Sequence, residues 1–224
     1  MTEKENWQFD FIDMDDPQPR EQSPGDKKKS AGLALPESSR ITITLDEIDT
    51  VKKMKHEKAK AVMGNIPRPN QAIHIIQNGN FDFFNYLPIL VDKMNGCDEA
   101  YLTTWTMNRQ NVQDLFDLYD EKRIRKVSLI TGVYFKSRET AVYSMLMEYV
   151  QARQQQYLTC RMHAKIMLLA NFERDIFLCL EGSANFTANP RIEQAVITNS
   201  LKLYNFHKNW QEELHEQTNQ SREN

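Results

Sequence analysis

Five polar residues in the last third of the chain have types and spacing that suit chemistry at a single site. They are His163 and Lys165 in a His-x-Lys, Ser183 and Asn185 in a Gly-Ser-x-Asn, and the downstream Glu193. Near neutral pH a histidine acts as a nucleophile or as a general acid and base. Lysine and asparagine donate hydrogen bonds to non-bridging phosphoryl oxygens. No carboxylate cluster accompanies the set, so we expect phosphoryl transfer without a metal ion.

Three predicted strands position these residues at one edge of a sheet. The strands are expected over 158–169, 175–180 and 194–198, with a polar turn between the first two. Side chains alternate between the faces of a strand, so His163 and Lys165 share a face. Ser183 and Asn185 also share one if the second strand runs on to Asn185. A hairpin of these strands would bring both pairs together, and Glu193 would reach the same rim from the start of the third strand.

The motifs resemble those of the phospholipase D superfamily. The matching residues are His163, Lys165, Gly182, Ser183, Asn185 and Glu193, and the likeness extends roughly from 72 to 210. In one respect the sequence departs from the usual HxKxxxxD pattern, because Ala170 occupies the position of the aspartate. The resemblance implies a phospholipase D-like single domain that needs neither a metal nor another cofactor.

The resemblance also implies a mechanism that uses two histidines. One attacks phosphorus to give a phosphohistidine, and the other protonates the leaving oxygen and then activates water. This chain has one HxK motif, so we expect a homodimer in which the His163 side chains of two subunits face each other. Lys165 and Asn185 would hold the phosphate oxygens, Ser183 would shape the phosphate pocket, and Glu193 would orient His163.

Small single-motif members of the superfamily resemble nucleases. We therefore expect hydrolysis of a phosphodiester in nucleic acid, with DNA favoured over RNA. Two alternatives remain open. In one, Ala170 marks a degenerate domain that binds nucleic acid or a protein partner without cutting it. In the other, the chain is an unusual phospholipase or phosphatidyl transferase, which would need a hydrophobic channel.

Further substrate contacts are expected outside the motifs. The predicted substrate-binding residues are Lys52, Lys53, Lys55, Asn78 and Arg109. The lysines belong to a helix expected over 42–64, which is either a phosphate-contacting arm or a solvated amphipathic helix packed on the domain. Arg109 would contact phosphate from the loop after a strand, or Asn108 would instead cap the next helix. His74 lies in an apolar strand and is expected to be a core residue.

Alternating strands and helices predict the fold around the site. Ahead of the motif we expect strands over 72–76, 100–107 and 127–135 and helices over 81–94, 110–119 and 138–154, with a last helix over 203–216. This order favours an α/β domain with a mostly parallel or mixed β-sheet sandwiched by helices, over 66–216. Flanking it we expect a mostly disordered tail over 1–40, a basic amphipathic helix over 41–65, and a frayed tail over 217–224.

The composition and the apolar patterning of the chain limit the possible ligands and cellular location of the protein. The chain has 224 residues, is 26% charged and carries a formal net charge of −3, so any attraction to nucleic acid must be local. Its three cysteines form no paired motif, and His56, His207 and His215 show no ligand spacing that would predict zinc. No apolar run approaches membrane-spanning length and no signal peptide is evident, so we expect a cytoplasmic protein without membrane contact. An aromatic segment over 7–14 is a candidate docking motif for a protein partner.

Overall fold

The computed structural model describes residues 57–61, 63–77, 81–187 and 191–223, and side chains up to residue 218. The described residues belong to one compact unit. The end of the predicted basic helix is helical over 57–61, where Lys58 and Lys60 are exposed. The predictions for the tail over 1–40, for Lys52, Lys53 and Lys55, and for Asn78 concern positions outside the described residues.

The core of this unit is a seven-stranded sheet in the order β1-β7-β6-β5-β2-β3-β4. The strands are β1 (Ala72–Gln77), β2 (Glu99–Thr104), β3 (Val127–Gly132), β4 (Gln156–Cys160), β5 (Ile166–Asn171), β6 (Ile176–Gly182) and β7 (Glu193–Asn199). Parallel pairing is confined to β2, β3 and β4, and every other neighbouring pair is antiparallel. The predicted α/β class with a mixed sheet is confirmed.

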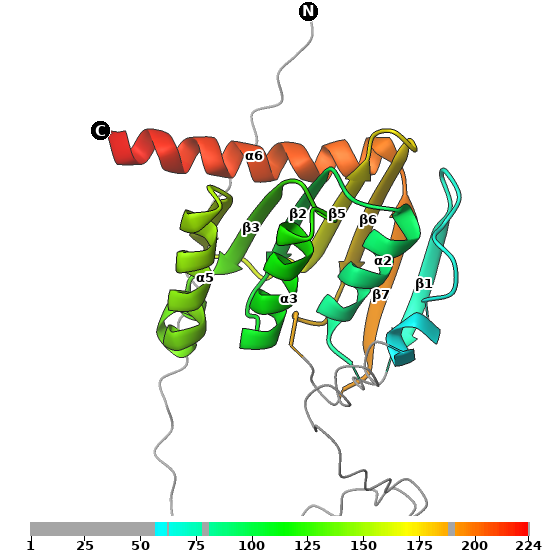
Figure 1. Cartoon of the computed structure of the whole chain (residues 1–224), viewed down its shortest axis with the longest axis horizontal. Coiled ribbons are helices and arrows are strands. Elements are labelled where there is room, and N and C mark those ends of the chain that lie inside the picture. The colour runs from blue at the N-terminus through cyan, green and yellow to red at the C-terminus, as the bar shows by residue number, and fades with distance from the viewer. Residues whose placement is uncertain (1–56, 62, 78–80, 188–190, 224) are drawn as a thin grey trace, which may run out of the picture. The chain divides into compact units, whose positions relative to one another are not determined.

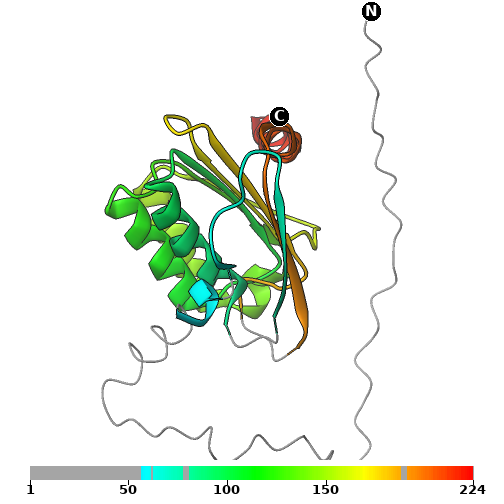
Figure 2. The ribbon, with the colours of Figure 1, turned by 90° about the vertical axis from the view of Figure 1, so that its right-hand side faces the viewer.

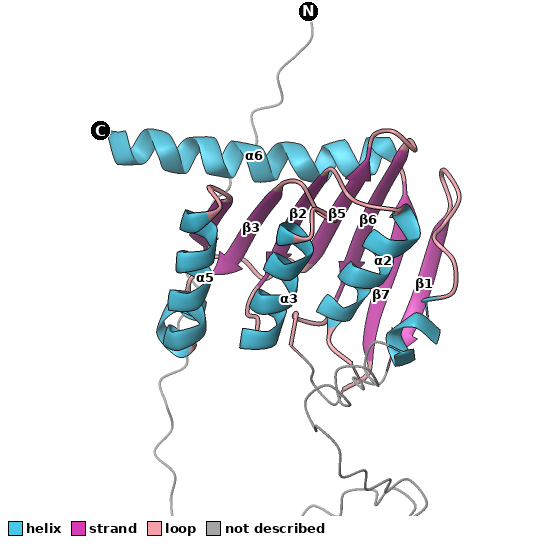
Figure 3. Cartoon of the chain, viewed as in Figure 1, coloured by secondary structure: helices cyan, strands magenta, loops and turns pink. Residues whose placement is uncertain are grey.

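Helices cover both faces of the sheet. They are the 3₁₀ turn η2 (Phe83–Asn85), α2 (Tyr86–Met94), α3 (Arg109–Asp120), α4 (Tyr134–Arg138), α5 (Thr140–Ala152) and α6 (Leu201–Glu223). Figure 1 shows α2, α3 and α5 side by side in front of the strands, with α6 crossing one end of the sheet. The turned view in Figure 2 places α6 on the opposite side of the sheet from these three helices. Figure 3 shows the same arrangement by type of secondary structure.

Two apolar clusters follow from the alternation of side chains along the central strands. Strands β2, β3 and β5 are buried on both faces. Met167 and Leu169 join the large core shared with α2, α3 and α5. Leu168 and Ala170 point the other way and join a smaller cluster that includes Tyr204 of α6. The centre of the sheet is therefore buried on both faces, and its strand ends form the edges on which a site can be built.

The structure corrects the prediction of one strand over 158–169. Residues 156–160 form β4, which pairs with β3 at the sheet edge, whereas 166–171 form β5 between β2 and β6. Residues 161–165 carry the chain between these positions without strand structure. Both strands are apolar, so hydrophobicity alone does not reveal the crossing.

Three smaller differences concern helices and one histidine. The helix predicted over 138–154 corresponds to α5, whereas the strand predicted over 127–135 ends at Gly132 and is followed by α4. Helix α6 continues to Glu223 through most of the predicted frayed tail. His74 is exposed and not a core residue, because the buried positions of β1 are its neighbours Ile75 and Gln77.

Candidate active site

The motif residues lie where β5 begins, β6 ends and β7 begins. The amide of Gly182 donates to the carbonyl of Lys165 (3.1 Å), and the amide of Ser183 donates to the carbonyl of Gln194 (3.1 Å). Antiparallel pairing of β5 with β6 and of β6 with β7 therefore brings these strand ends to one edge. We call this edge the rim; it carries His163, Lys165, Ser183, Asn185 and Glu193.

Lys165 and His163 are in direct contact at the rim. The Lys165 ammonium Nζ lies 2.8 Å from Nδ1 and 3.1 Å from Nε2 of the imidazole. His163 is exposed, whereas Lys165 is only 5% exposed. Partial desolvation and the charge of Lys165 lower the pKa of His163, which favours the neutral, nucleophilic ring at neutral pH.

Lys165 is a buried cation. Among the described residues no carboxylate lies within 4.0 Å of its ammonium. Burial lowers its pKa, and the negative charge of Glu193 opposes this change. A buried charge destabilises a protein unless it is paired. An anion bound at the rim would pair with the Lys165 ammonium and so remove this destabilisation.

Ser183 and Glu193 form a separate pair beside this contact. The Ser183 hydroxyl donates to the Glu193 carboxylate. The same hydroxyl oxygen accepts a hydrogen bond from the Gln194 amide (3.0 Å). In this structure the Glu193 carboxylate therefore fixes Ser183, whereas the sequence predicted that it would orient His163.

The segment after β6 is held by two close contacts. The Phe186 amide donates to the Thr104 hydroxyl (3.2 Å), which anchors the Gly-Ser-x-Asn segment to β2. A Cβ atom on Gly182 would lie 2.5 Å from the Phe83 ring, so this position needs glycine.

Oδ1 of Asn185 is buried and has no hydrogen-bond partner among the described residues. Such an atom is rare in native structures. Because an amide oxygen only accepts hydrogen bonds, donation from Asn185 to a phosphate oxygen would have to come from Nδ2 of the same side chain.

Ala170 is remote from the rim. It lies five positions after Lys165, which on a strand is about 16 Å. Its side chain is fully buried, and its partner across the ladder to β2 is Glu99. The missing aspartate therefore concerns packing under α6 and does not remove a group from the rim.

Trp105 and Arg138 also contribute to the rim. Trp105 follows β2, and its ring centroid lies 6.1 Å from that of His163. The Arg138 guanidinium, at the end of α4, lies 5.1 Å from the Trp105 ring centroid. Arg138 was not among the residues predicted from the sequence. No local pattern signals this residue, because it reaches the rim only through the parallel pairing of β2 with β3.

Arg109 has a different position from the one predicted. It is the exposed first residue of α3, and Asn108 caps this helix by accepting from the Asn111 amide (2.9 Å). The helix-cap interpretation of Asn108 is thus confirmed. No contact joins Arg109 to the rim residues in the described part of the chain.

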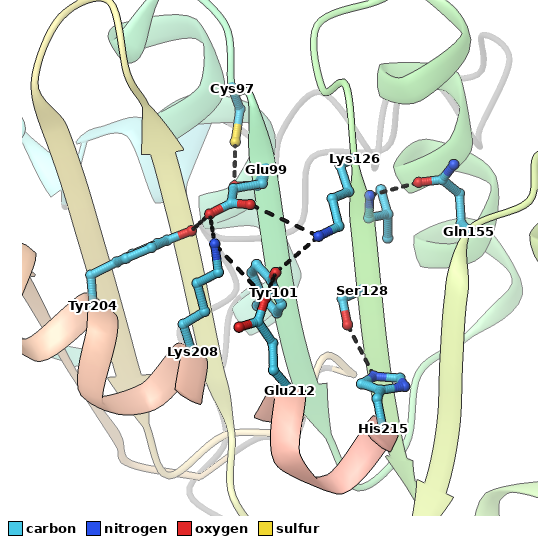
Figure 4. A network of polar contacts seen from close by, with 11 residues as sticks. Cys97, Glu99, Tyr101, Lys126, Ser128, Gln155, Tyr204, Lys208, Glu212 and His215 are labelled. Carbon is cyan, nitrogen blue, oxygen red and sulfur yellow. Dashed lines mark hydrogen bonds and ion pairs between the residues drawn. The ribbon is translucent and has the colours of Figure 1, made fainter. Parts of the chain in front are cut away.

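A second polar cluster lies between the sheet and α6 (Figure 4). Glu99 accepts from the Tyr204 hydroxyl (2.7 Å) and from the Lys208 ammonium. Tyr101 donates to Glu212 (2.6 Å) and accepts from Lys126 (3.0 Å). We call this group, together with the hydrogen-bonded pair Ser128 and His215 (3.0 Å), the α6 network. Its charged and hydroxyl groups satisfy one another.

One group of potential metal ligands also lies on the α6 side. The ligand atoms of Cys179, Glu181 and His207 are all within 4.8 Å of one another. Nε2 of His207 lies 3.2 Å from the Glu181 carboxylate, and Nδ1 accepts from the Trp210 indole (3.1 Å). Burial raises the pKa of the Cys179 thiol, which keeps it protonated. Both nitrogens of a neutral His207 therefore have partners without an ion.

Comparisons with known proteins give structural likenesses only. No protein-family model and no curated protein matches the sequence. Similar solved structures include polyphosphate kinase from Porphyromonas gingivalis (17% identity, TM-score 0.43) and TrmBL2, an archaeal chromatin protein (13%, 0.47). A third is phosphatidylserine synthase from Haemophilus influenzae (11%, 0.42).

The matched regions cover 58%, 76% and 69% of this chain, in that order, but only 23%, 62% and 40% of the three other chains. The chain therefore spans less than two thirds of each of these proteins. Separately, no helix in the described residues is long and apolar enough to cross a lipid bilayer.

Proposed function

We propose that this protein hydrolyses phosphodiester bonds in nucleic acid without a metal ion, with His163 as the nucleophile. The observation that carries the proposal is the contact between an exposed imidazole and a buried ammonium that forms no ion pair with a carboxylate among the described residues. The likeness of the motifs to those of the phospholipase D superfamily supports the same chemistry. The cationic, hydrogen-bonding rim suits a phosphate diester, whose two non-bridging oxygens share one negative charge.

In the first step the neutral His163 ring attacks phosphorus. A nitrogen–phosphorus bond forms, the bond to the leaving oxygen breaks, and a protonated second imidazole gives that oxygen a proton. In the second step the same imidazole removes a proton from water, which displaces His163 from phosphorus. Lys165 and Asn185 hold the non-bridging oxygens throughout, and Ser183, fixed by Glu193, shapes the phosphate pocket.

The second imidazole is proposed to be His163 of another copy of the chain. A two-fold axis at the rim would bring two copies of the single HxK motif together. Ile192, next to Glu193, is 80% exposed, and Ile76 on the adjoining β1 is 71% exposed. Exposed apolar side chains beside the motif are consistent with a surface that a second subunit covers.

A binding function without cleavage is the second candidate. The observation that favours it is the pairing of Glu193 with Ser183, which leaves His163 without an orienting carboxylate among the described residues. In that case the rim would bind the phosphates of nucleic acid but would not activate His163.

Hydrolysis in excess EDTA tests the proposal, with single-stranded DNA, double-stranded DNA and RNA as substrates. We expect cleavage by the wild type and its loss in His163→Ala. His74→Ala is the matched control, because His74 is an exposed histidine on β1 outside the motif. Cleavage that needs added metal, or that survives in His163→Ala, would contradict the mechanism. Retained binding without cleavage by the wild type would favour the second candidate.

Subunit mixing tests the shared site. Wild type and His163→Ala are unfolded together, refolded at different ratios and assayed in EDTA. If each reaction needs both copies of His163, activity falls as the square of the wild-type fraction. A linear fall would show that each chain acts alone and would contradict the dimeric site.

A further inference from the structure

Three side chains form an aromatic and cationic stack beside His163. Trp105 follows the carboxyl end of β2, and Tyr134 and Arg138 lie on α4, just after the carboxyl end of β3. The Arg138 guanidinium lies 5.1 Å from the Trp105 ring centroid and 5.6 Å from that of Tyr134. We call this group the aromatic stack.

Glycine at position 132 allows the Trp105 ring to take this position. A Cβ atom on Gly132 would collide with Cδ1 of the indole, so any other residue would displace the ring. The ring stands at 58° to the imidazole of His163, with the two centroids 6.1 Å apart. A group stacked on Trp105 would therefore lie within one nucleotide of a phosphate at His163.

The stack remains available to a ligand. Tyr134 is 47% exposed, and Trp105 is half-buried. Arg138 is exposed, and no carboxylate among the described residues pairs with it. By contrast, Arg153 stacks on Tyr149 at 4.8 Å but is also bound by the Asp120 carboxylate. Arg138 thus keeps its hydrogen-bond donors, whereas Arg153 uses them within the protein.

We propose that the aromatic stack binds an unpaired nucleobase next to the scissile phosphate, so that the substrate is single-stranded at the cleavage point. This inference rests on the proposed function and specifies its substrate class. Every base offers a π-face to an aromatic side chain, and such stacking is tolerant of sequence. Base pairs in a duplex are already stacked on their neighbours, so a duplex offers this surface no free base. Arg138 contributes a further stacking plane and donors for the adjoining phosphate.

The test measures binding, separately from cleavage, in protein carrying His163→Asn. The probes are a fluorescent oligothymidylate, an abasic oligonucleotide of the same length, and a duplex. Trp105→Leu should weaken binding to the oligothymidylate by roughly 10-fold, the effect expected for the loss of one stacked base. Binding to the abasic probe should change less than about 2-fold, because that probe has phosphates but no bases to stack.

Two further variants make the result decisive. Tyr134→Leu removes an exposed ring, does not threaten the fold, and should also weaken only the base-containing probe. Arg153→Gln is the matched control, because it disrupts a similar cation–aromatic contact away from the rim. It should bind all three probes as well as the parent protein does.

The inference is overturned if Trp105→Leu and Tyr134→Leu bind the oligothymidylate normally. It is also overturned if they lose the abasic probe equally, or if the parent protein binds no oligothymidylate. If the wild type cleaves DNA but these variants bind normally, the inference fails and the proposed function stands. If the wild type cuts nothing but binding still depends on bases and on Trp105, the binding of an unpaired base by the stack stands and hydrolysis fails.

Discussion

The rim and the α6 network contain the same kinds of residues, but the polar groups are paired in one region and partly unpaired in the other. Each contains lysine, histidine, serine and glutamate, and each lies on the same sheet. In the α6 network the Glu99 carboxylate binds Lys208 and Tyr204 directly (Figure 4). At the rim, within the described part of the chain, the Lys165 ammonium contacts His163 but no carboxylate, and Oδ1 of Asn185 is buried without a hydrogen-bond partner.

The difference separates polar groups that stabilise the fold from polar groups available to a ligand. A buried polar group that is fully paired fixes one arrangement of the elements around it. An unpaired one lowers stability and is retained where it has another role. The Ser128–His215 pair shows why residue types alone mislead, since its hydrogen bond of 3.0 Å resembles that of a catalytic pair. Ser128 is fully buried beneath α6, so no substrate can reach it.

The largest expected effect comes from Lys165→Met at the rim. Removing one donor that stabilises transition-state charge should lower the rate of hydrolysis by roughly 100- to 1000-fold. The midpoint of thermal unfolding should stay the same or rise, because an apolar side chain replaces a buried, unpaired cation. Steady-state kinetics and thermal melts check both parts. A large fall in stability with little change in rate would place Lys165 in the scaffold.

The opposite pattern is expected for Glu99→Gln in the α6 network. The amide cannot neutralise Lys208, so we expect the free energy of unfolding to fall by about 2 kcal/mol, the scale of a lost hydrogen bond between charged groups. The rate of hydrolysis per folded molecule should not change. Chemical denaturation gives the first quantity and an assay below the transition gives the second. Glu212→Gln is the control, with a smaller loss of stability, because its side chain is 41% exposed.

The smallest expected effect is a dependence of the free energy of unfolding on pH, which arises in the α6 network. Burial and the nearby Lys126 charge lower the pKa of His215 from its ordinary value of 6.5, although Glu212 opposes them. As the pH falls below 6.5, the unfolded chain binds a proton before the folded protein does, so the free energy of unfolding decreases. Below the lowered pKa of the folded state the decrease levels off.

Denaturation curves between pH 7 and pH 5 measure this loss. His215→Gln should make the dependence on pH shallower, since the amide can still bond to Ser128 but does not titrate. Some dependence will remain, because burial also lowers the pKa of His207. An unchanged profile in His215→Gln would contradict the assignment of His215 to the stabilising network.

The sequence predicts which residues lie at the rim better than it predicts the strands that lead the chain to the rim. Strands predicted over 175–180 and 194–198 correspond to β6 (Ile176–Gly182) and β7 (Glu193–Asn199), because both are short apolar segments with polar boundaries. The division between β4 and β5 was missed, since Met162 and Ala164 continue the apolar alternation across it. Sequence spacing does not record that this segment crosses from the sheet edge to its centre.

Contacts between segments far apart in the sequence were the other feature that the sequence did not predict. The approach of Arg138 to Trp105 depends on the parallel alignment of β2 with β3, which no local pattern specifies. The pairing of Glu193 with Ser183 depends likewise on the register of β6 with β7. Motif spacing identified the residues, but the hydrogen-bond partner of each one depends on tertiary structure.

Trapping the covalent intermediate tests the central claim most directly. Wild-type protein is mixed with single-stranded DNA in EDTA and quenched rapidly in alkaline denaturant, which preserves phosphohistidine, and its peptides are then mapped by mass spectrometry. We expect a nucleotide phosphate attached to His163, and no adduct in His163→Ala. Cleavage without an adduct on His163, or with an adduct on another residue, would contradict the assignment of the nucleophile.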